Sequence, residues 1–172
     1  MKVYLASDHA GFELKKELLT FIPTLPVAEG QDAYEVEDCG ALELDPNDDY
    51  PQYIAIAARG LSRDETGGLE AAAIIIGASG QGEAMVANRF AGVRCALYYG
   101  EAAGDQTDMS GVHLDILAST RQHNHANALS LGARFISIDQ AKEAVRIWLS
   151  TPFSQEERHV RRVDHIDSVV HE

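Results

Sequence analysis

The sequence predicts an α/β protein: a doubly wound, Rossmann-like parallel sheet of five strands, with helices on both faces and a C-terminal helical tail. Apolar runs of strand length alternate along the 172 residues with amphipathic segments of helical period. The run at 71–77, AAAIIIG, is apolar throughout, as expected of a central strand covered on both faces. Polar or glycine-rich segments follow two of these runs, where ligands bind in folds of this class.

Strands and helices alternate through the first half of the chain. The pattern predicts strands at 2–7, 34–42 and 71–77 and helices at 11–22 and 50–64. Apolar residues at 14, 18, 21 and 22 give the first helix one buried face, and Pro51 suits the first turn of the second helix. We therefore expect one strand-helix unit followed by another before the central strand.

The same alternation continues through the second half. It predicts strands at 94–99 and 128–137 and helices at 82–90, 113–124 and 139–150. The last of these helices has apolar residues at 141, 144, 145, 148 and 149, and Asp139 is its predicted N-cap. These elements complete the five strands.

The chain length is that of one domain with one substantial core, so residues 1–172 are expected to form a single domain. Pro152 ends the last helix, and apolar residues at 160, 163, 166, 169 and 170 then resume helical spacing. This tail, 151–172, carries an apolar stripe that packs either on its own core or on a second subunit. The pattern alone does not decide between the two.

Composition and charge exclude several classes of function. The formal net charge of −13 disfavours binding to nucleic acid, and no window approaches the roughly 18 apolar residues of a membrane span. Asp8 and His9 come too early for a signal peptide, which predicts a cytoplasmic location. Cys39 and Cys95 lie in no metal-binding or disulfide pattern and are expected to be buried free thiols.

The loop at 77–83, GASGQGE, is the first candidate site. Glycines let backbone N–H groups approach an anion, which makes a candidate oxyanion or phosphate cradle of Ala78, Ser79, Gly80, Gln81 and Gly82. The spacing matches neither of the common nucleotide-binding glycine motifs. A tight turn without a ligand is the alternative. Glu83 is either a catalytic carboxylate or an acid that favours the first turn of a helix.

Two histidines lie beside other polar groups. Asp8 and His9 directly follow the first strand, where solvent and ligand meet. His123 and Asn124 belong to RQHNHAN, a dense set of hydrogen-bonding side chains. A solvated helix face explains the second segment equally well.

The tail adds the basic cluster Arg158, Arg161 and Arg162, which is either a solvated helix face or a phosphate site. Together the candidate sites supply a carboxylate base, N–H donors, a proton-transferring histidine and arginines for a phosphate. Aldose-ketose isomerisation of a phosphorylated sugar needs these groups, because a base moves a proton between adjacent carbons while donors stabilise the enediolate. This chemistry requires neither a metal nor another cofactor, and none is expected.

The chain also resembles the type B ribose-5-phosphate isomerases, in the family that contains the galactose-6-phosphate isomerase subunits. The matching stretches run in order through most of the chain: SDHAGFELK (7–15), DYPQYIAIAA (49–58), IIIGASGQGEAMVANRFAGVRCAL (74–97), RQHNHANALSLGAR (121–134) and RHVRRVDHI (158–166). Many members carry a cysteine as the base directly after the third strand, where this chain has Gly77. A second branch instead places a glutamate after the glycine loop, which Glu83 matches.

The resemblance implies a role for each candidate residue. Glu83 would be the proton acceptor, and His123 would be the proton donor that opens the furanose ring. Asp8 and His9 would contact the sugar phosphate beside the cradle of residues 78–82. The remaining residues are implied to bind substrate, Asn124 and Arg134, or its phosphate, Arg158 and Arg162.

In the family the C-terminal arginines reach the site of a neighbouring subunit. The resemblance therefore implies a homodimer, with a tetramer as the alternative, and a tail that packs on the partner. The implied activity is interconversion of ribose 5-phosphate and ribulose 5-phosphate in the pentose phosphate pathway. Isomerisation of a six-carbon sugar phosphate, of the galactose or allose type, is the alternative within the class. A non-catalytic sugar-phosphate sensor is a further alternative, but it would need neither Glu83 nor His123.

Overall fold

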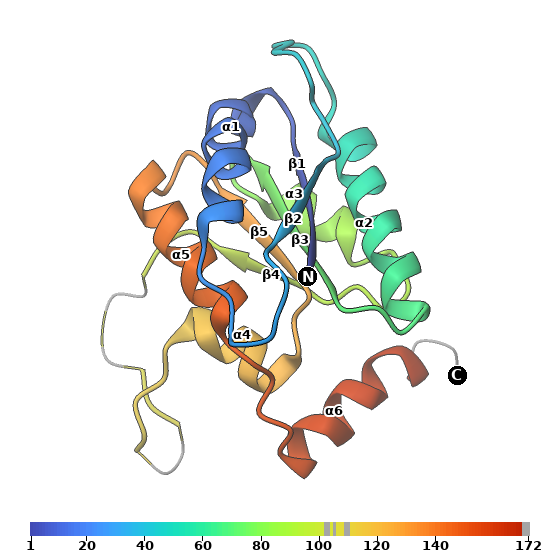
Figure 1. Cartoon of the computed structure of the whole chain (residues 1–172), viewed down its shortest axis with the longest axis vertical. Coiled ribbons are helices and arrows are strands. Elements are labelled where there is room, and N and C mark those ends of the chain that lie inside the picture. The colour runs from blue at the N-terminus through green and yellow to red at the C-terminus, as the bar shows by residue number, and fades with distance from the viewer. Residues whose placement is uncertain (102–103, 105, 109–110, 170–172) are drawn as a thin grey trace.

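A computed structural model describes residues 1–101, 104, 106–108 and 111–169. Its five strands form one sheet, and every neighbouring pair runs parallel, which confirms the predicted sheet. In chain order the strands are β1 (Lys2–Ser7), β2 (Glu35–Asp38), β3 (Ala71–Gly77), β4 (Cys95–Tyr98) and β5 (Ala128–Gly132). Their spatial order is β2-β1-β3-β5-β4, so β3 lies at the centre (Figure 1).

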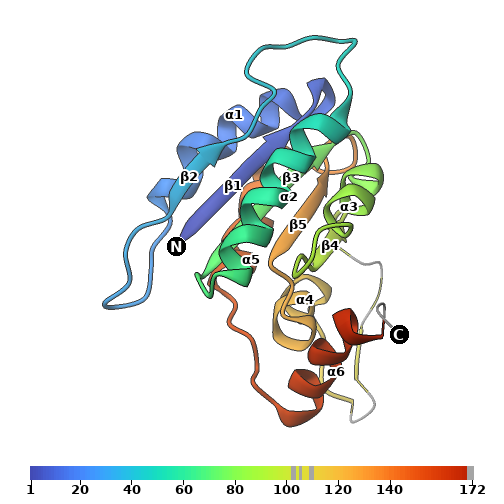
Figure 2. The ribbon, with the colours of Figure 1, turned by 90° about the vertical axis from the view of Figure 1, so that its right-hand side faces the viewer.

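Helices cover both faces of this sheet (Figures 1 and 2). The helices of the faces are α1 (Phe12–Phe21), α2 (Tyr50–Thr66), α3 (Gln81–Ala87), α4 (Ile116–Asn124) and α5 (Ile138–Ser150). A further helix, α6 (Glu157–Ser168), packs against α4. Short 3₁₀ turns precede and follow α1 at His9–Gly11 and Ile22–Thr24. Among the described residues, none of the helices has the length and apolarity to cross a membrane.

The central strand divides the core into two layers. Ile74 and Ile76 pack with α1, α4 and α5 on one face, whereas Ile75 packs with α2 and α3 on the other. Successive side chains of a strand point to opposite faces, so a strand that is buried on both faces needs an apolar residue at every position. Trp148 of α5 is fully buried on the first face, and its indole N–H donates to the Thr120 hydroxyl of α4 at 3.0 Å.

Several predicted boundaries are wrong, each for a local reason. The fifth strand ends at Gly132 rather than 137, because the N–H groups of Ala133 and Arg134 donate to the carbonyls of Gly77 and Ala78 and turn the chain across the end of β3. The second strand ends at Asp38 rather than 42, just before Gly40 enters the left-handed region with φ of 102°.

The N-termini of two helices also differ from the prediction. Asp139 lies within α5, whose N-cap is Ser137; its hydroxyl accepts from the Gln140 N–H, and the Gln140 side chain accepts from the Ser137 N–H. Helix α4 begins three residues later than 113, at Ile116, with Asp115 accepting from the Ala118 N–H at 2.8 Å.

Candidate active site

A buried carboxylate stands at the end of the central strand. Glu83, in the first turn of α3, is only 4% exposed. A Cβ added at Gly77 would overlap its Oε1 and Cδ atoms, so the Glu83 carboxylate occupies the space that a side chain at position 77 would fill. Glycine at 77 and glutamate at 83 are therefore coupled by geometry.

The environment of Glu83 suits it to accept a proton. Burial is the main effect that raises the pKa of its carboxyl above the ordinary value, and the charge of nearby Asp8 raises it further. A backbone N–H contact opposes the shift. In its ionised form, a carboxylate with a raised pKa is a stronger base than an exposed one.

The loop between Gly77 and Glu83 is held by its carbonyls. The Gly77 and Ala78 carbonyls accept from the N–H groups of the turn after β5, and the Gly80 carbonyl accepts from the Ser130 hydroxyl at 2.7 Å. Gly80 has φ of 73°, and a Cβ there would lie 2.8 Å from the Leu97 side chain. Within the described part of the chain, the N–H groups of Ser79 and Gly80 have no acceptor. The loop therefore has the free donors that an oxyanion cradle needs.

Two tyrosine side chains from outside the loop lie against the cradle. The Gln81 amide donates to the Tyr99 hydroxyl at 3.0 Å. A Cβ at Gly82 would lie 2.5 Å from the hydroxyl of Tyr50, the first residue of α2. Tyr50 was not among the predicted site residues, although it lies in DYPQYIAIAA (49–58), one of the stretches that match the family.

Asp8 and His9 lie at the same end of the sheet. Asp8 is buried, and its carboxylate caps the turn His9–Gly11 by accepting from the Ala10 N–H at 3.0 Å. His9 Nδ1 lies 2.6 Å from Asp48 Oδ1, and this bond is the main cause that raises the pKa of His9. The Asp8 charge raises the pKa of His9 further, whereas Arg134 lowers it.

The trio Asp8, His9 and Asp48 places three potential metal ligands within 4.8 Å of one another. The 2.6 Å between His9 Nδ1 and Asp48 Oδ1 is the length of a hydrogen bond. Two ligand atoms that share one tetrahedral metal lie about 3.3 Å apart. The arrangement is therefore that of a hydrogen-bonded ion pair.

A second group of predicted residues lies elsewhere. His123, Asn124 and Arg162 line a cavity of about 320 Å³ between α4 and α6. The ring of buried His159 lies 4.4 Å from the His123 ring, and its Nδ1 lies 2.7 Å from the Ser154 hydroxyl. Arg158 is not part of this cavity lining and pairs with Glu156 at 2.9 Å.

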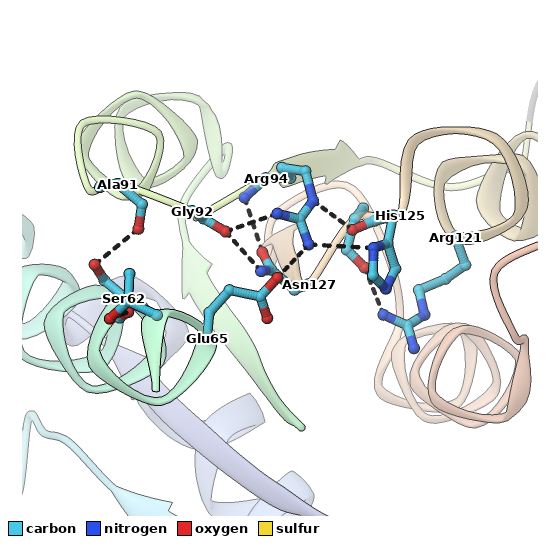
Figure 3. A network of polar contacts seen from close by, with 10 residues as sticks. Ser62, Glu65, Ala91, Gly92, Arg94, Arg121, His125 and Asn127 are labelled. Atoms are coloured by element: carbon cyan, nitrogen blue, oxygen red, sulfur yellow. Dashed lines mark hydrogen bonds and ion pairs between the residues drawn. The ribbon is translucent and has the colours of Figure 1, made fainter. Parts of the chain in front are cut away.

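A polar network fixes the end of α4 that carries His123 and Asn124 (Figure 3). The next residue, His125, has a left-handed φ of 49°, and its carbonyl accepts from Arg94 Nε at 2.7 Å. Arg94 also donates to the Gly92 carbonyl at 3.0 Å and pairs with Glu65 at 2.7 Å. Arg94 was not among the predicted site residues, because Glu65 and His125 lie 29 and 31 residues away in the sequence.

The two groups lie at opposite edges of the sheet. Asp8 and His9 follow β1, Glu83 lies in α3 after β3, and Arg134 follows β5, so all four are at the edge where the parallel strands end. Helices α4 and α6 lie at the other edge (Figure 2). The register pairs Ala73 with Ala128 and Gly77 with Gly132, a span of four residues or about 13 Å along the strands. Within one chain, the structure does not bring His123, Asn124 and Arg162 together with Glu83.

Neither cysteine has the acidity to replace Glu83 as a base. Cys39 is buried and Cys95 is half-buried, both as free thiols. Burial raises the pKa of Cys39 to about 11 and that of Cys95 to about 12. Both therefore stay protonated near neutral pH.

Known proteins resemble the chain over nearly its whole length. Residues 3–166 match the sequence model of the Ribose/Galactose Isomerase family. Ribose-5-phosphate isomerase B of Mycobacterium tuberculosis is 36% identical over 165 residues, which cover 95% of this chain and 86% of the relative. The same-named protein of Mycolicibacterium paratuberculosis is 34% identical, covering 95% and 88%.

Solved structures agree with these matches. Ribose-5-phosphate isomerase B of Mycoplasma genitalium, with bound ribulose-5-phosphate, superposes with a TM-score of 0.79 at 30% identity and covers 99% of this chain and 97% of that one. The enzyme of Clostridium thermocellum gives a TM-score of 0.78 at 29% identity, covering 99% and 98%.

Proposed function

We propose that the chain interconverts ribose 5-phosphate and ribulose 5-phosphate, because it belongs to the ribose/galactose isomerase family. The relatives named above are ribose-5-phosphate isomerases B, and one of their structures holds ribulose-5-phosphate. The observation that carries the proposal is the Glu83 carboxylate, buried over Gly77 beside a loop with free N–H donors. A base next to an oxyanion cradle is what the reaction needs.

The chemistry follows from this arrangement. Glu83 takes the proton from C2 of the open-chain aldose, and the electron pair of the broken C–H bond forms the C1–C2 double bond of an enediolate. The N–H groups of Ser79 and Gly80 stabilise the charge on its oxygen. Protonated Glu83 then returns the proton to C1, and transfer of the O2 proton to O1 leaves the carbonyl at C2.

Substitution of Glu83 by Gln tests this role. The amide keeps the shape of the side chain but cannot accept the proton, so kcat falls by at least about 100-fold while KM changes little. Isomerisation is followed as ribulose 5-phosphate formation. Turnover near that of the wild type would show that Glu83 is not the base.

We further propose that the active site forms between two copies of the chain. His123 and Arg162 lie at the opposite edge of the sheet from Glu83, so a neighbouring subunit must supply them. In the chain itself the first half of the tail already packs on α4, through the rings of His159 and His123. Residues 170–172 of the predicted tail, 151–172, lie outside the described residues.

Subunit mixing tests the dimer. Glu83→Gln and His123→Asn are each expected to inactivate the protein, but one site of every mixed dimer keeps both residues intact. Random exchange in a two-fold dimer restores about a quarter of wild-type activity. A site within one chain would give no restoration, and sedimentation that shows a monomer at assay concentration would also exclude the shared site.

Turnover measurements test whether the protein prefers a five-carbon or a six-carbon sugar phosphate. The proposed chemistry serves five- and six-carbon sugar phosphates alike, so kcat/KM is compared on ribose 5-phosphate, allose 6-phosphate and galactose 6-phosphate. We expect the ribose ester to be preferred. Activity confined to the six-carbon esters would overturn the assignment, and binding without turnover on any of them would indicate a sensor. A cytoplasmic location stays a prediction.

A further inference from the structure

Asp48 is an inward-turned acid in an otherwise exposed loop. Its side chain is 2% exposed, although the loop residues 42–47 and 49 on either side are exposed. Oδ1 accepts the backbone N–H of His9 at 3.1 Å and lies 2.6 Å from His9 Nδ1. One carboxylate oxygen thus fixes both the backbone and the ring of His9, across 39 residues of sequence.

The contact determines which ring nitrogen is free. Nδ1 must carry a proton to donate to the Asp48 carboxylate, so Nε2 is the atom left for a ligand. Asp8 Oδ2 lies 3.9 Å from the same Nδ1. The groups that face His9 are thus Asp48 and Asp8, which favour the imidazolium, and Arg134, which opposes it.

The second carboxylate oxygen of Asp48 is in an unfavourable environment. Oδ2 is buried and has no hydrogen-bond partner among the described residues. A buried carboxylate oxygen without a partner lowers stability, whereas an Asp turned to solvent would not. The ion pair with His9 is the interaction that offsets this cost.

We propose that Asp48 is a positioning residue that holds His9 as a cationic donor, with Nε2 aimed at the phosphate of the substrate. This rests on the proposed function, in which His9 contacts the sugar phosphate. His9 and Arg134 then present two positive groups at the edge of the sheet where Glu83 lies, in a chain with a net charge of −13. The carboxylate acts through His9 and touches no substrate atom.

Asp48→Asn tests the proposal, with Glu43→Gln as the matched control. Both variants remove one negative charge from the same loop, but Glu43 is exposed. In Asp48→Asn, NMR titration is expected to show the pKa of His9 falling toward its ordinary value of 6.5, with no change in Glu43→Gln. An unchanged pKa of His9 in Asp48→Asn overturns the proposal.

Kinetics give a second readout. At a pH between the His9 pKa values of the two proteins, His9 is mostly neutral in the Asn variant and mostly cationic in the wild type. Loss of one charge-assisted bond to phosphate then raises KM about tenfold or more with little change in kcat. Near pH 5.5 both proteins carry the imidazolium, so the ratio of their KM values shrinks. The ionisation of the substrate phosphate cancels in this ratio. A pH-independent ratio, equal to that of Glu43→Gln, contradicts the proposal.

Two further measurements test the role of Asp48 even if Asp48→Asn does not fold or if the wild type is not an isomerase. If Asp48→Asn does not fold, the wild type still decides, because a His9 pKa at or below 6.5 overturns the proposal. If the wild type isomerises no sugar phosphate, the proposed function fails, but inorganic phosphate remains a probe. Phosphate is then expected to shift the His9 resonances and, at a pH between the His9 pKa values of the two proteins, to bind Asp48→Asn more weakly. Equal affinity for the two proteins overturns the role of Asp48.

Discussion

Substitution of Gly77 by alanine is expected to inactivate the protein by displacing the base, although Glu83 itself is left unchanged. The added Cβ would overlap Oε1 and Cδ of Glu83 and lie 2.7 Å from Oε2. Non-bonded heavy atoms pack at about 3.5 Å, so the carboxylate must move by more than about 1 Å. The base would then leave the position beside the cradle from which it reaches the substrate carbon.

The size of the effect follows from that displacement. A misplacement of about 1 Å costs on the order of 100-fold in rate, or about 2.7 kcal/mol of transition-state stabilisation. Forcing one extra methyl into a filled space also lowers the free energy of unfolding by about 1–3 kcal/mol. KM is expected to change little, because the proposed phosphate ligands lie on other elements.

A double-mutant cycle with Glu83→Ala isolates the cause. The assays are kcat for ribulose 5-phosphate formation and the free energy of unfolding from urea denaturation. Gly77→Ala is expected to destabilise the wild type but to be nearly neutral in the Glu83→Ala background, where the space is empty. A kcat within threefold of the wild type, or equal destabilisation in both backgrounds, would refute the argument.

Three further predictions follow from the geometry. Arg162→Ala, measured by steady-state kinetics, is expected to raise KM about tenfold with a smaller effect on kcat, and an unchanged KM would remove Arg162 from the phosphate site. Activity needs ionised Glu83 and is lost as pH falls through the raised pKa of this residue. Asp8→Asn removes a charge that raises the pKa of Glu83, so the acidic limb of the kcat profile should move to lower pH. Arg94→Ala leaves the His125 carbonyl and Glu65 without their partner, so urea denaturation should show a loss of about 2–3 kcal/mol; a loss under about 0.5 kcal/mol would show that the network does not stabilise this turn.

Periodicity was sufficient to predict the sheet and its covering helices, because burial on one or both faces leaves a direct mark on the sequence. Periodicity did not predict the ends of these elements, because single hydrogen bonds determine where a strand or helix begins and ends. The run ALSLGARFIS is apolar enough to continue as a strand, yet the tie from Ala133 to the Gly77 carbonyl ends β5 at Gly132. Likewise, Ser137 and Asp139 are both acceptable caps, and the Gln140 side chain selects the first.

The candidate site could be predicted in part for a similar reason. The fold class itself brings to one edge both a residue that directly follows a strand, such as Asp8, and a residue in the first turn of the helix after a strand, such as Glu83. Asp48 escaped prediction because a loop of several acids gives no sign of which one turns inward. His123 precedes β5 rather than following it, so the same topology that assembles the first group places His123 at the other edge.

The geometry at the end of β3 separates the place of the base from the residue that supplies it. A side chain at position 77 would reach this point directly from the strand, as the cysteine of many family members is expected to do. Glu83 reaches it from α3, because the loop turns back at Gly80 and its carbonyls are tied to the end of β5. The two arrangements exclude each other, since one space cannot hold both side chains. A change at position 77 or 83 alone therefore leaves either no base or a clash, and only a paired change moves the base from one residue to the other.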